Sequence, residues 1–195
     1  TKFLNISAEN DYFGLVNITC TGYDDGMPIL NDTDNFIVNV TGVNDAPDVN
    51  ASALDYMILA EDTYNDTINL SNYVDDVDDL DAEINWTCSS NESDVAVTAN
   101  NITKILNLSA TNGFNGLVNV TCTATDAGKW TPGRSSDTDN FIVNVTGVND
   151  APDVNTSALD YMQLAEDTFN DTINLSNYVD DVDDLDSEIN WTCLS

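Results

Sequence analysis

The stretch GLVNVTCTAT at residues 116–125 alternates apolar and polar side chains along its whole length. In a β-strand successive side chains point to opposite faces, so Val118, Val120 and Cys122 share one face. Asn119 lies on the opposite face. Alternation with a period of two predicts a half-buried strand rather than a helix. We therefore expect this stretch to turn one face to an apolar core and the other to solvent.

Six further stretches are expected to form strands, and Asn, Asp, Gly and Pro turn signals separate them. They are residues 56–59, 66–70, 83–88, 95–99, 102–109 and 140–148. About seven short strands without a helical period favour an all-β fold, an antiparallel β-sandwich of the Ig-like kind. Trp86 and Cys88 share a face and are expected to join the core.

The chain repeats itself. Residues 32–88 recur at 137–193 with a shift of 105, and only four of the 57 positions differ. Residues 1–20 match 103–122 at 13 of 20 positions. Neighbouring repeats this similar give each junction the same geometry, which suits a rod or fibre.

The repeat divides the chain into three parts. Residues 46–150 make one complete repeat, residues 1–45 the C-terminal half of a preceding one, and residues 151–195 the N-terminal half of a following one. A repeat of this length suits one sandwich domain. We expect either a segment of a larger polypeptide or a polymer unit whose half-domains are completed by neighbouring repeats or subunits.

Asn-x-Ser/Thr glycosylation acceptors are unusually dense. The 27 Asn and 34 Ser plus Thr residues would give roughly five by chance. Seventeen are present: Asn5, Asn17, Asn31, Asn39, Asn50, Asn65, Asn69, Asn85, Asn91, Asn101, Asn107, Asn119, Asn144, Asn155, Asn170, Asn174 and Asn190. Eleven carry a large apolar middle residue, which in a strand points inward while Asn and Thr point outward. The pattern favours covalent glycans and an extracellular location; the alternative is a merely polar outer face.

The charge is extremely one-sided. Four Lys and Arg face 35 Asp and Glu, and the formal net charge is −31 with no His. Such a surface repels nucleic acid and anionic lipid, so neither is an expected partner. The 42% of hydrophobic residues and their alternation argue against disorder. Self-repulsion calls for divalent cations or a saline medium. No apolar run is long enough to predict a membrane span.

The cysteines predict a disulfide. Cys88 and Cys122 lie 34 residues apart, each in an inward-facing strand phase. A bond between them would tie the two sheets together and stabilise by roughly 3–4 kcal/mol in the loop-entropy model. A zinc site, the alternative, lacks His and close Cys spacing. Cys20 aligns with Cys122 and Cys193 with Cys88, so we expect their partners beyond the chain ends or in the next unit.

Several motifs resemble cadherin repeats. They are NDAP at residues 44–47 and 149–152, DVD at 76–78, ATDAG at 124–128, AEDT at 60–63 and NGFNG at 112–116. NDAP resembles the linker that ends cadherin domains. DVD resembles the cadherin Asp-x-Asp pair, and ATDAG resembles the turn before the last cadherin strand. The others look like segments of cadherin-like repeats in giant prokaryotic surface proteins. With the density of acceptors, this resemblance fits an archaeal surface fibre.

The resemblance implies calcium between domains. The first junction would use Asn44, Asp45, Asp76, Asp78 and Asp126, and the second Glu61, Asn149, Asp150, Asp181 and Asp183. Carboxylate and carbonyl oxygens are the ligands that calcium takes. The cadherin Leu-Asp-Arg-Glu segment has no match, and residues 112–116 stand in its place. The alternative is a solvated acidic loop at residues 75–81 with NDAP as a simple turn.

Two functions compete. The first is a structural segment of a glycosylated extracellular filament, stalk or surface coat. The second is a calcium-dependent adhesin that binds a protein or glycan through loops such as residues 128–136, which carry Lys129, Trp130 and Arg134. Without His or a G-x-S-x-G motif, no nucleophilic triad is visible, so we do not expect an enzyme.

Overall fold

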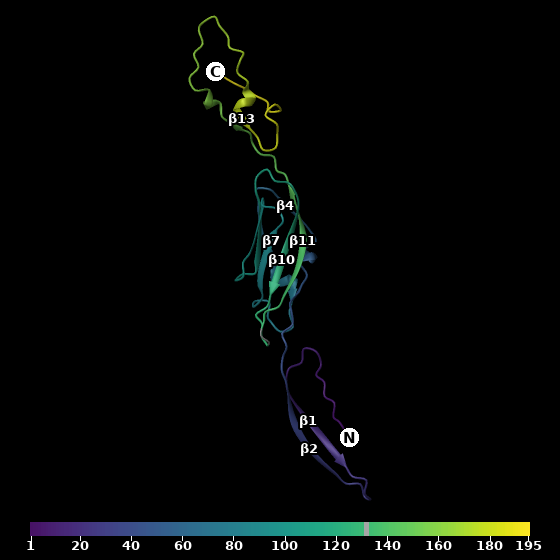
Figure 1. The fold of residues 1–195 in the computed structure, drawn as a ribbon. Helices are drawn as coiled ribbons and strands as arrows, with labels where there is room; N and C mark the ends of the chain where they lie inside the picture. The colour runs from purple at the N-terminus through teal and green to yellow at the C-terminus, as the bar shows by residue number, and fades with distance from the viewer. Residues whose placement is uncertain (131–132) are drawn as a thin grey trace.

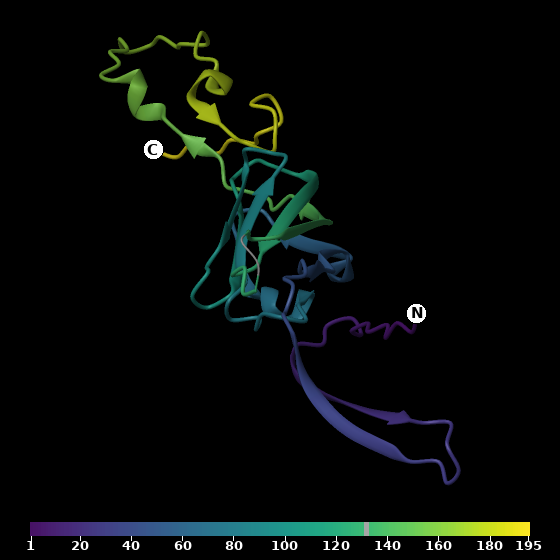
Figure 2. The same cartoon turned by 60° about the horizontal axis from the view of Figure 1, so that its bottom comes forward.

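The chain is elongated, with three units following one another along its length (Figure 1). The computed structural model describes residues 1–130 and 133–195. We call residues 1–45 the first unit, 46–150 the central unit and 151–195 the last unit. Figure 2 shows the same succession from a second direction, with the central unit between the other two. No helix in the described part of the chain is long and apolar enough to cross a membrane.

Two sheets form the central unit. The first has the order β4-β11-β10-β7 and the second β5-β9-β8. The strands are β4 (Tyr56–Ala60), β5 (Tyr64–Asn69), β7 (Asn85–Ser90), β8 (Val95–Ala99), β9 (Ile105–Ala110), β10 (Gly116–Thr125) and β11 (Ser136–Thr146). The fold is thus an all-β sandwich, as predicted. One pair departs from the antiparallel pattern, because β4 runs parallel to β11.

The core lies between these sheets. Val118, Val120 and Cys122 are fully buried on one face of β10, and Trp86 of β7 is buried with them. The core residues run in sequence from Val49 to Val145. The alternation in residues 116–125 therefore predicted the core face correctly. The boundaries of β8 and β10 also agree with the predicted ones.

The expected strand at residues 102–109 begins too early. The side-chain oxygen of Asn100 accepts hydrogen bonds from the backbone N–H groups of Ile102 and Thr103, which forms a turn. Ile102 is 93% exposed, and β9 starts only at Ile105. Asn and Asp side chains compete in this way for nearby backbone donors. The acceptor at Asn101 therefore lies in a turn and not in a strand.

The disulfide joins Cys88 of β7 to Cys122 of β10. These strands are neighbours in one sheet, and the two residues face each other directly in the ladder. The expectation that the bond would connect the two sheets is therefore wrong. When two cysteines point inward from directly paired positions of neighbouring strands, their sulfur atoms lie close together within one sheet. The bond then does not need to span the core between the two sheets. The bond closes the 34-residue segment that contains β8 and β9.

Short elements surround the sheets. Strands β3 (Asp48–Val49) and β6 (Val74–Asp75) pair next to the 3₁₀ turns η1 (Ala51–Leu54) and η2 (Leu70–Tyr73). The last unit repeats this arrangement with β12 (Asp153–Val154), β13 (Val179–Asp180), η3 (Thr156–Leu159) and η4 (Leu175–Tyr178). The first unit is a hairpin of β1 (Gly14–Tyr23) and β2 (Asn31–Val40).

Candidate functional site: two acidic junctions

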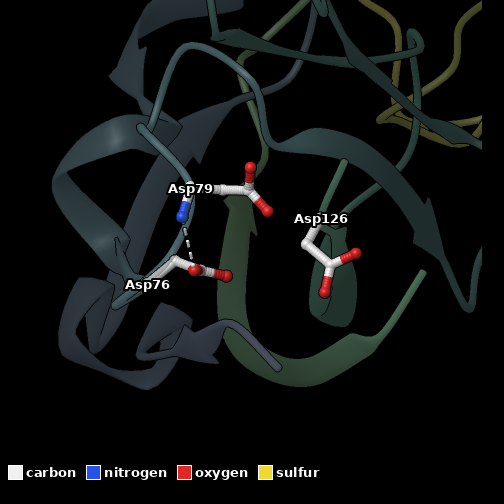
Figure 3. A group of neighbouring side chains, drawn as sticks. All are labelled: Asp76, Asp79 and Asp126. Carbon is white, nitrogen blue, oxygen red and sulfur yellow. Dashed lines mark hydrogen bonds between the residues drawn. The ribbon is translucent and has the colours of Figure 1, made fainter. Parts of the chain in front are cut away.

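Three carboxylates meet where the first unit joins the central one. Asp76 and Asp79 lie in the loop after β6, and Asp126 directly follows β10. Oxygen atoms of the three lie within 4.8 Å of one another. Figure 3 shows the three side chains beside one another, with the carboxyl groups of Asp76 and Asp79 on the side that faces Asp126. Asp76 holds the loop in place, since its Oδ1 accepts the backbone N–H of Asp79 at 2.9 Å.

Burial makes this cluster costly without a counter-charge. Asp79 and Asp126 are buried, and the Oδ2 atoms of Asp76 and Asp79 are buried without a hydrogen-bond partner. Desolvation, followed by the charge of Asp76, raises the pKa of the Asp79 carboxyl above its ordinary value. Unpartnered buried carboxylate oxygens are unfavourable unless a cation or proton reaches them.

The linker residues of the first junction approach the same cluster. The side-chain amide of Asn44 donates to Asp126 Oδ2 at 2.7 Å. The backbone N–H of Asp45 donates to Asp78 Oδ2, also at 2.7 Å. The structure thus places all five predicted residues of the first junction close together: Asn44, Asp45, Asp76, Asp78 and Asp126. Asp79 was not among the expected residues, although the acidic run 75–81 contains it.

The second junction is organised around Glu61, which is fully buried after β4. Its Oε1 accepts the backbone N–H of Val148 at 2.8 Å, while Oε2 is buried without a partner. Across the junction, the backbone N–H of Asp150 donates to Asp183 Oδ2 at 2.7 Å. Asp181 corresponds to Asp76 in both respects. Its Oδ1 accepts a hydrogen bond from the backbone N–H of Asp183, and its Oδ2 is buried without a hydrogen-bond partner.

Two further residues, Asp62 and Asn112, lie at the second junction and were not among the predicted ligands. The Asn112 amide donates to Asp62 Oδ2 at 3.3 Å and to Asp150 Oδ2 at 3.0 Å. Asn112 opens the segment 112–116, so an amide occupies the region where the cadherin pattern has charged ligands. Desolvation, and then the charges of Asp62 and Asp183, raise the pKa of Asp150. Asn149 lies beside them and donates to the backbone oxygen of Asp150.

The loop considered for adhesion contacts the first unit. The rings of Trp130 and Phe13 lie 4.5 Å apart between centroids. A Cβ atom at Gly42 would come within 2.7 Å of the Trp130 ring, so only glycine allows this approach. The Lys129 ammonium donates to the backbone oxygen of Asp78 at 2.6 Å. Trp130 thus packs at the junction; residues 131 and 132 of this loop lie outside the described residues.

All seventeen acceptor Asn residues are exposed or half-buried. Several of them use their side-chain oxygens to accept hydrogen bonds, among them Asn65, Asn69 and Asn91. Asn101 pairs with the backbone of Trp86 through both its amide nitrogen and its oxygen. The Oδ1 atom of Asn119 is buried without a partner, although the residue lies on the outer face of β10. The outward placement agrees with glycosylation and with a polar face alike.

Lys104 is a buried charge that the sequence did not reveal. It is 6% exposed, and its ammonium donates to the backbone oxygen of Ile84 at 2.5 Å. Burial lowers the pKa of this amine. The bond connects the turn before β9 to the residue that precedes β7, so Lys104 joins the two sheets.

The fold is similar to that of cadherin extracellular domains. Domains 1–5 of protocadherin gamma B2 match with a TM-score of 0.56 and 19% identity over 73% of this chain and 28% of that one. Domains 3–6 of protocadherin gammaB7, in a cis-dimer structure, match with a TM-score of 0.55 and 22% identity over 82% of this chain and 38% of that one. This chain therefore spans well under half of either structure. No family model and no curated protein sequence matches this chain.

The chain therefore has a cadherin-like sandwich fold, with an acidic cluster at each end of the central unit. Carboxylate and amide oxygens of this kind suit a hard divalent cation, and calcium takes six to eight such ligands. The orphaned buried oxygens at both junctions are the observation that fits a bound ion.

Proposed function

We propose that the chain is a structural segment of a glycosylated extracellular filament, stalk or surface coat. The observation that carries this proposal is the position of the acidic clusters at the two ends of the central unit. In this arrangement a cation bound at each junction fixes the angle between successive units. A rod of units held in this way transmits force and spans distance, and it needs no catalytic cleft.

Calcium is the proposed cation. At the first junction the ligands are Asp76, Asp78, Asp79 and Asp126, with Asn44 and Asp45 from the linker. At the second they are Glu61, Asp62, Asp150, Asp181 and Asp183, with Asn112 and Asn149 supplying amide oxygens after a small rotation. A bound cation offsets the cost of burying the carboxylate oxygens that have no hydrogen-bond partner, such as those of Glu61, Asp79 and Asp181.

Covalent glycans are proposed to cover the outer faces. Acceptors on β7, β9, β10 and β11 have Asn directed away from the core. Glycans there shield a surface that already repels itself through its charge. Mapping of glycopeptides from native material tests this directly. If the peptides that contain the acceptors in these strands all lack glycans, the Asn and Thr residues serve only as a polar outer face, and the proposal of covalent glycans fails.

Calorimetric titration tests the metal. Asp79→Asn and Asp126→Asn should each weaken calcium binding at the first junction by tenfold or more, a loss of about 1.4 kcal/mol. Asp66→Asn is the matched control, because Asp66 is an exposed carboxylate in β5 and belongs to neither cluster. Unchanged titrations for both cluster variants would remove calcium from the proposal.

Electron microscopy of native material tests the assembly. Regular fibres with an axial repeat of one unit support the structural segment. Flexible stalks that end in separate heads would instead support adhesion. The packing of Trp130 against Phe13 removes one aromatic side chain that a ligand-binding loop would have used, so we favour the structural function.

A further inference from the structure

The segment at residues 112–116 contains two Asn-Gly pairs, Asn112-Gly113 and Asn115-Gly116. They are the only such pairs among the 27 Asn residues of the sequence. Glycine has no Cβ atom, so its backbone nitrogen can approach the side-chain amide carbon of the residue before it. In water this approach closes a five-membered succinimide ring, and the Asn side chain loses ammonia. The two pairs are therefore candidate sites of spontaneous deamidation.

The backbone at the first pair leaves the attacking nitrogen available. Asn112 and Gly113 are both exposed and lie in the turn between β9 and β10. Gly113 has a φ of +75°, which glycine adopts without strain. Within the part of the chain that the structure describes, its backbone N–H has no hydrogen-bond partner. Ring closure at Asn112 therefore breaks no backbone hydrogen bond of Gly113.

The second pair is held differently. Gly116 is the first residue of β10 and stands opposite Val145 in the ladder with β11. Ring closure there would disturb a strand that is paired within a sheet, and such strands open less readily than exposed turns. In the first unit the counterpart of Asn112 is Asn10, and Asp11 follows it instead of a glycine. Asn112 is thus the favoured site.

Asn112 also occupies a position where the change has a consequence. Its side-chain amide donates to Asp62 Oδ2 at 3.3 Å and to Asp150 Oδ2 at 3.0 Å. The neutral amide thereby bridges two carboxylates of the second junction. A carboxylate in its place has no N–H groups to donate and adds a third negative charge to the pair. A cation would then be needed to hold the three groups together.

We propose that Asn112 deamidates after folding and thereby strengthens cation binding at the second junction. This rests on the proposed function, which takes calcium as the cation. The deprotonated Gly113 nitrogen attacks Cγ of Asn112, and the Cγ–Nδ2 bond breaks with release of ammonia. Water then opens one of the two imide bonds of the succinimide, which leaves an aspartyl or an isoaspartyl residue. One water is consumed and one ammonia is released, and each product carries one new carboxylate.

Mass spectrometry of the folded 195-residue chain, incubated in a mildly alkaline buffer, tests the modification. Tryptic cleavage gives the peptide 105–129, whose fragment ions separate the two pairs. We expect Asn112 to deamidate about tenfold faster than Asn115, because the sheet restrains Gly116. In urea the two rates should converge, since both pairs then lie in an unfolded chain. An intact Asn112, or an Asn115 that reacts as fast in the folded chain, would overturn the proposal.

Calcium titration tests the consequence. Asn112→Asp represents the product, and Asn115→Asp is the matched control, because Asn115 is exposed and has no contact with Asp62 or Asp150. Both variants add the same charge to the chain. We expect Asn112→Asp to bind calcium at the second junction about tenfold more tightly than the control, since ligand charge sets calcium affinity. Equal calcium affinities for the two variants would overturn the proposal.

The two experiments separate this proposal from the proposed function. If Asn112 stays intact, this proposal alone fails, because calcium titration of the unmodified chain still decides the metal. If neither the unmodified chain nor Asn112→Asp binds calcium, the proposed metal fails, and the consequence assigned to deamidation fails with it.

Discussion

The first and central units contain nearly the same hairpin in two different surroundings. Residues 32–46 and 137–151 are identical, and in both units they pair with the preceding strand in the same register. In the central unit a second sheet covers the inner face, whereas the hairpin within residues 1–45 forms a sheet of two strands. Strand pairing is therefore a property of the hairpin itself, whereas burial depends on the rest of the sandwich.

The largest effect should come from deleting one buried ring. Phe141→Ala removes a side chain that is buried in the core of the central unit, and we expect the free energy of unfolding of that unit to fall by about 3–5 kcal/mol. Phe36→Ala, at the equivalent position of the first unit, should cost far less. Urea unfolding of the two variants measures both. Equal losses would show that the first unit already has a closed core.

The disulfide offers a second contrast. Replacing both Cys88 and Cys122 by Ala should destabilise the central unit by about 3–4 kcal/mol, because the unfolded chain regains the freedom of a 34-residue loop. Cys20→Ser should leave the unfolding of the monomer unchanged, since Cys20 is free. Differential scanning calorimetry under non-reducing conditions compares the two. A central unit with unchanged stability would contradict the importance of the bond.

A smaller contrast depends on pH. The backbone N–H of Ser52, and less strongly that of Asn140, lowers the pKa of Asp139, although burial opposes them. A carboxyl group with a lowered folded-state pKa stabilises the fold above its unfolded value of about 3.9 and loses this contribution as the pH falls. Asp139→Asn should therefore cost about 1–2 kcal/mol at neutral pH and almost nothing at strongly acidic pH.

Asp34→Asn is the control for this pH effect. Asp34 is the counterpart of Asp139 and is exposed, with Asn35 as a hydrogen-bond donor. Its replacement removes an exposed carboxylate and should cost less stability at neutral pH than Asp139→Asn. If both variants shift the profile equally, the Ser52 contact is not the source of the stabilisation.

The alternation of apolar and polar residues in the sequence was enough to predict which face of a strand is buried. Val118, Val120 and Cys122 were placed in the core correctly because a strand repeats every two residues. The pairing of β7 with β10 was missed, since alternation shows which face a cysteine occupies but not which strand lies beside it. The turn at Asn100 was missed because a side chain there competes with the backbone pattern.

The junctions show the same limit. The linker motif and the Asp-x-Asp pair identified Asn44, Asp45, Asp76 and Asp78, which the structure places near one another. Asp79 was missed because an acidic run gives no sign of which carboxylate the loop turns inward. Asn112 was missed as a partner of Asp150 because they belong to distant parts of the sequence. Such contacts follow from tertiary structure alone.

Small-angle X-ray scattering of the chain, with calcium and with a chelator, tests the central claim most directly. With calcium bound at both junctions, we predict the distance distribution of a single stiff rod. After chelation, repulsion among the junction carboxylates should broaden that distribution, and Asp126→Asn should show part of the same broadening in calcium. Identical curves in calcium and in chelator would contradict the claim that metal ions at the junctions set the shape of the molecule.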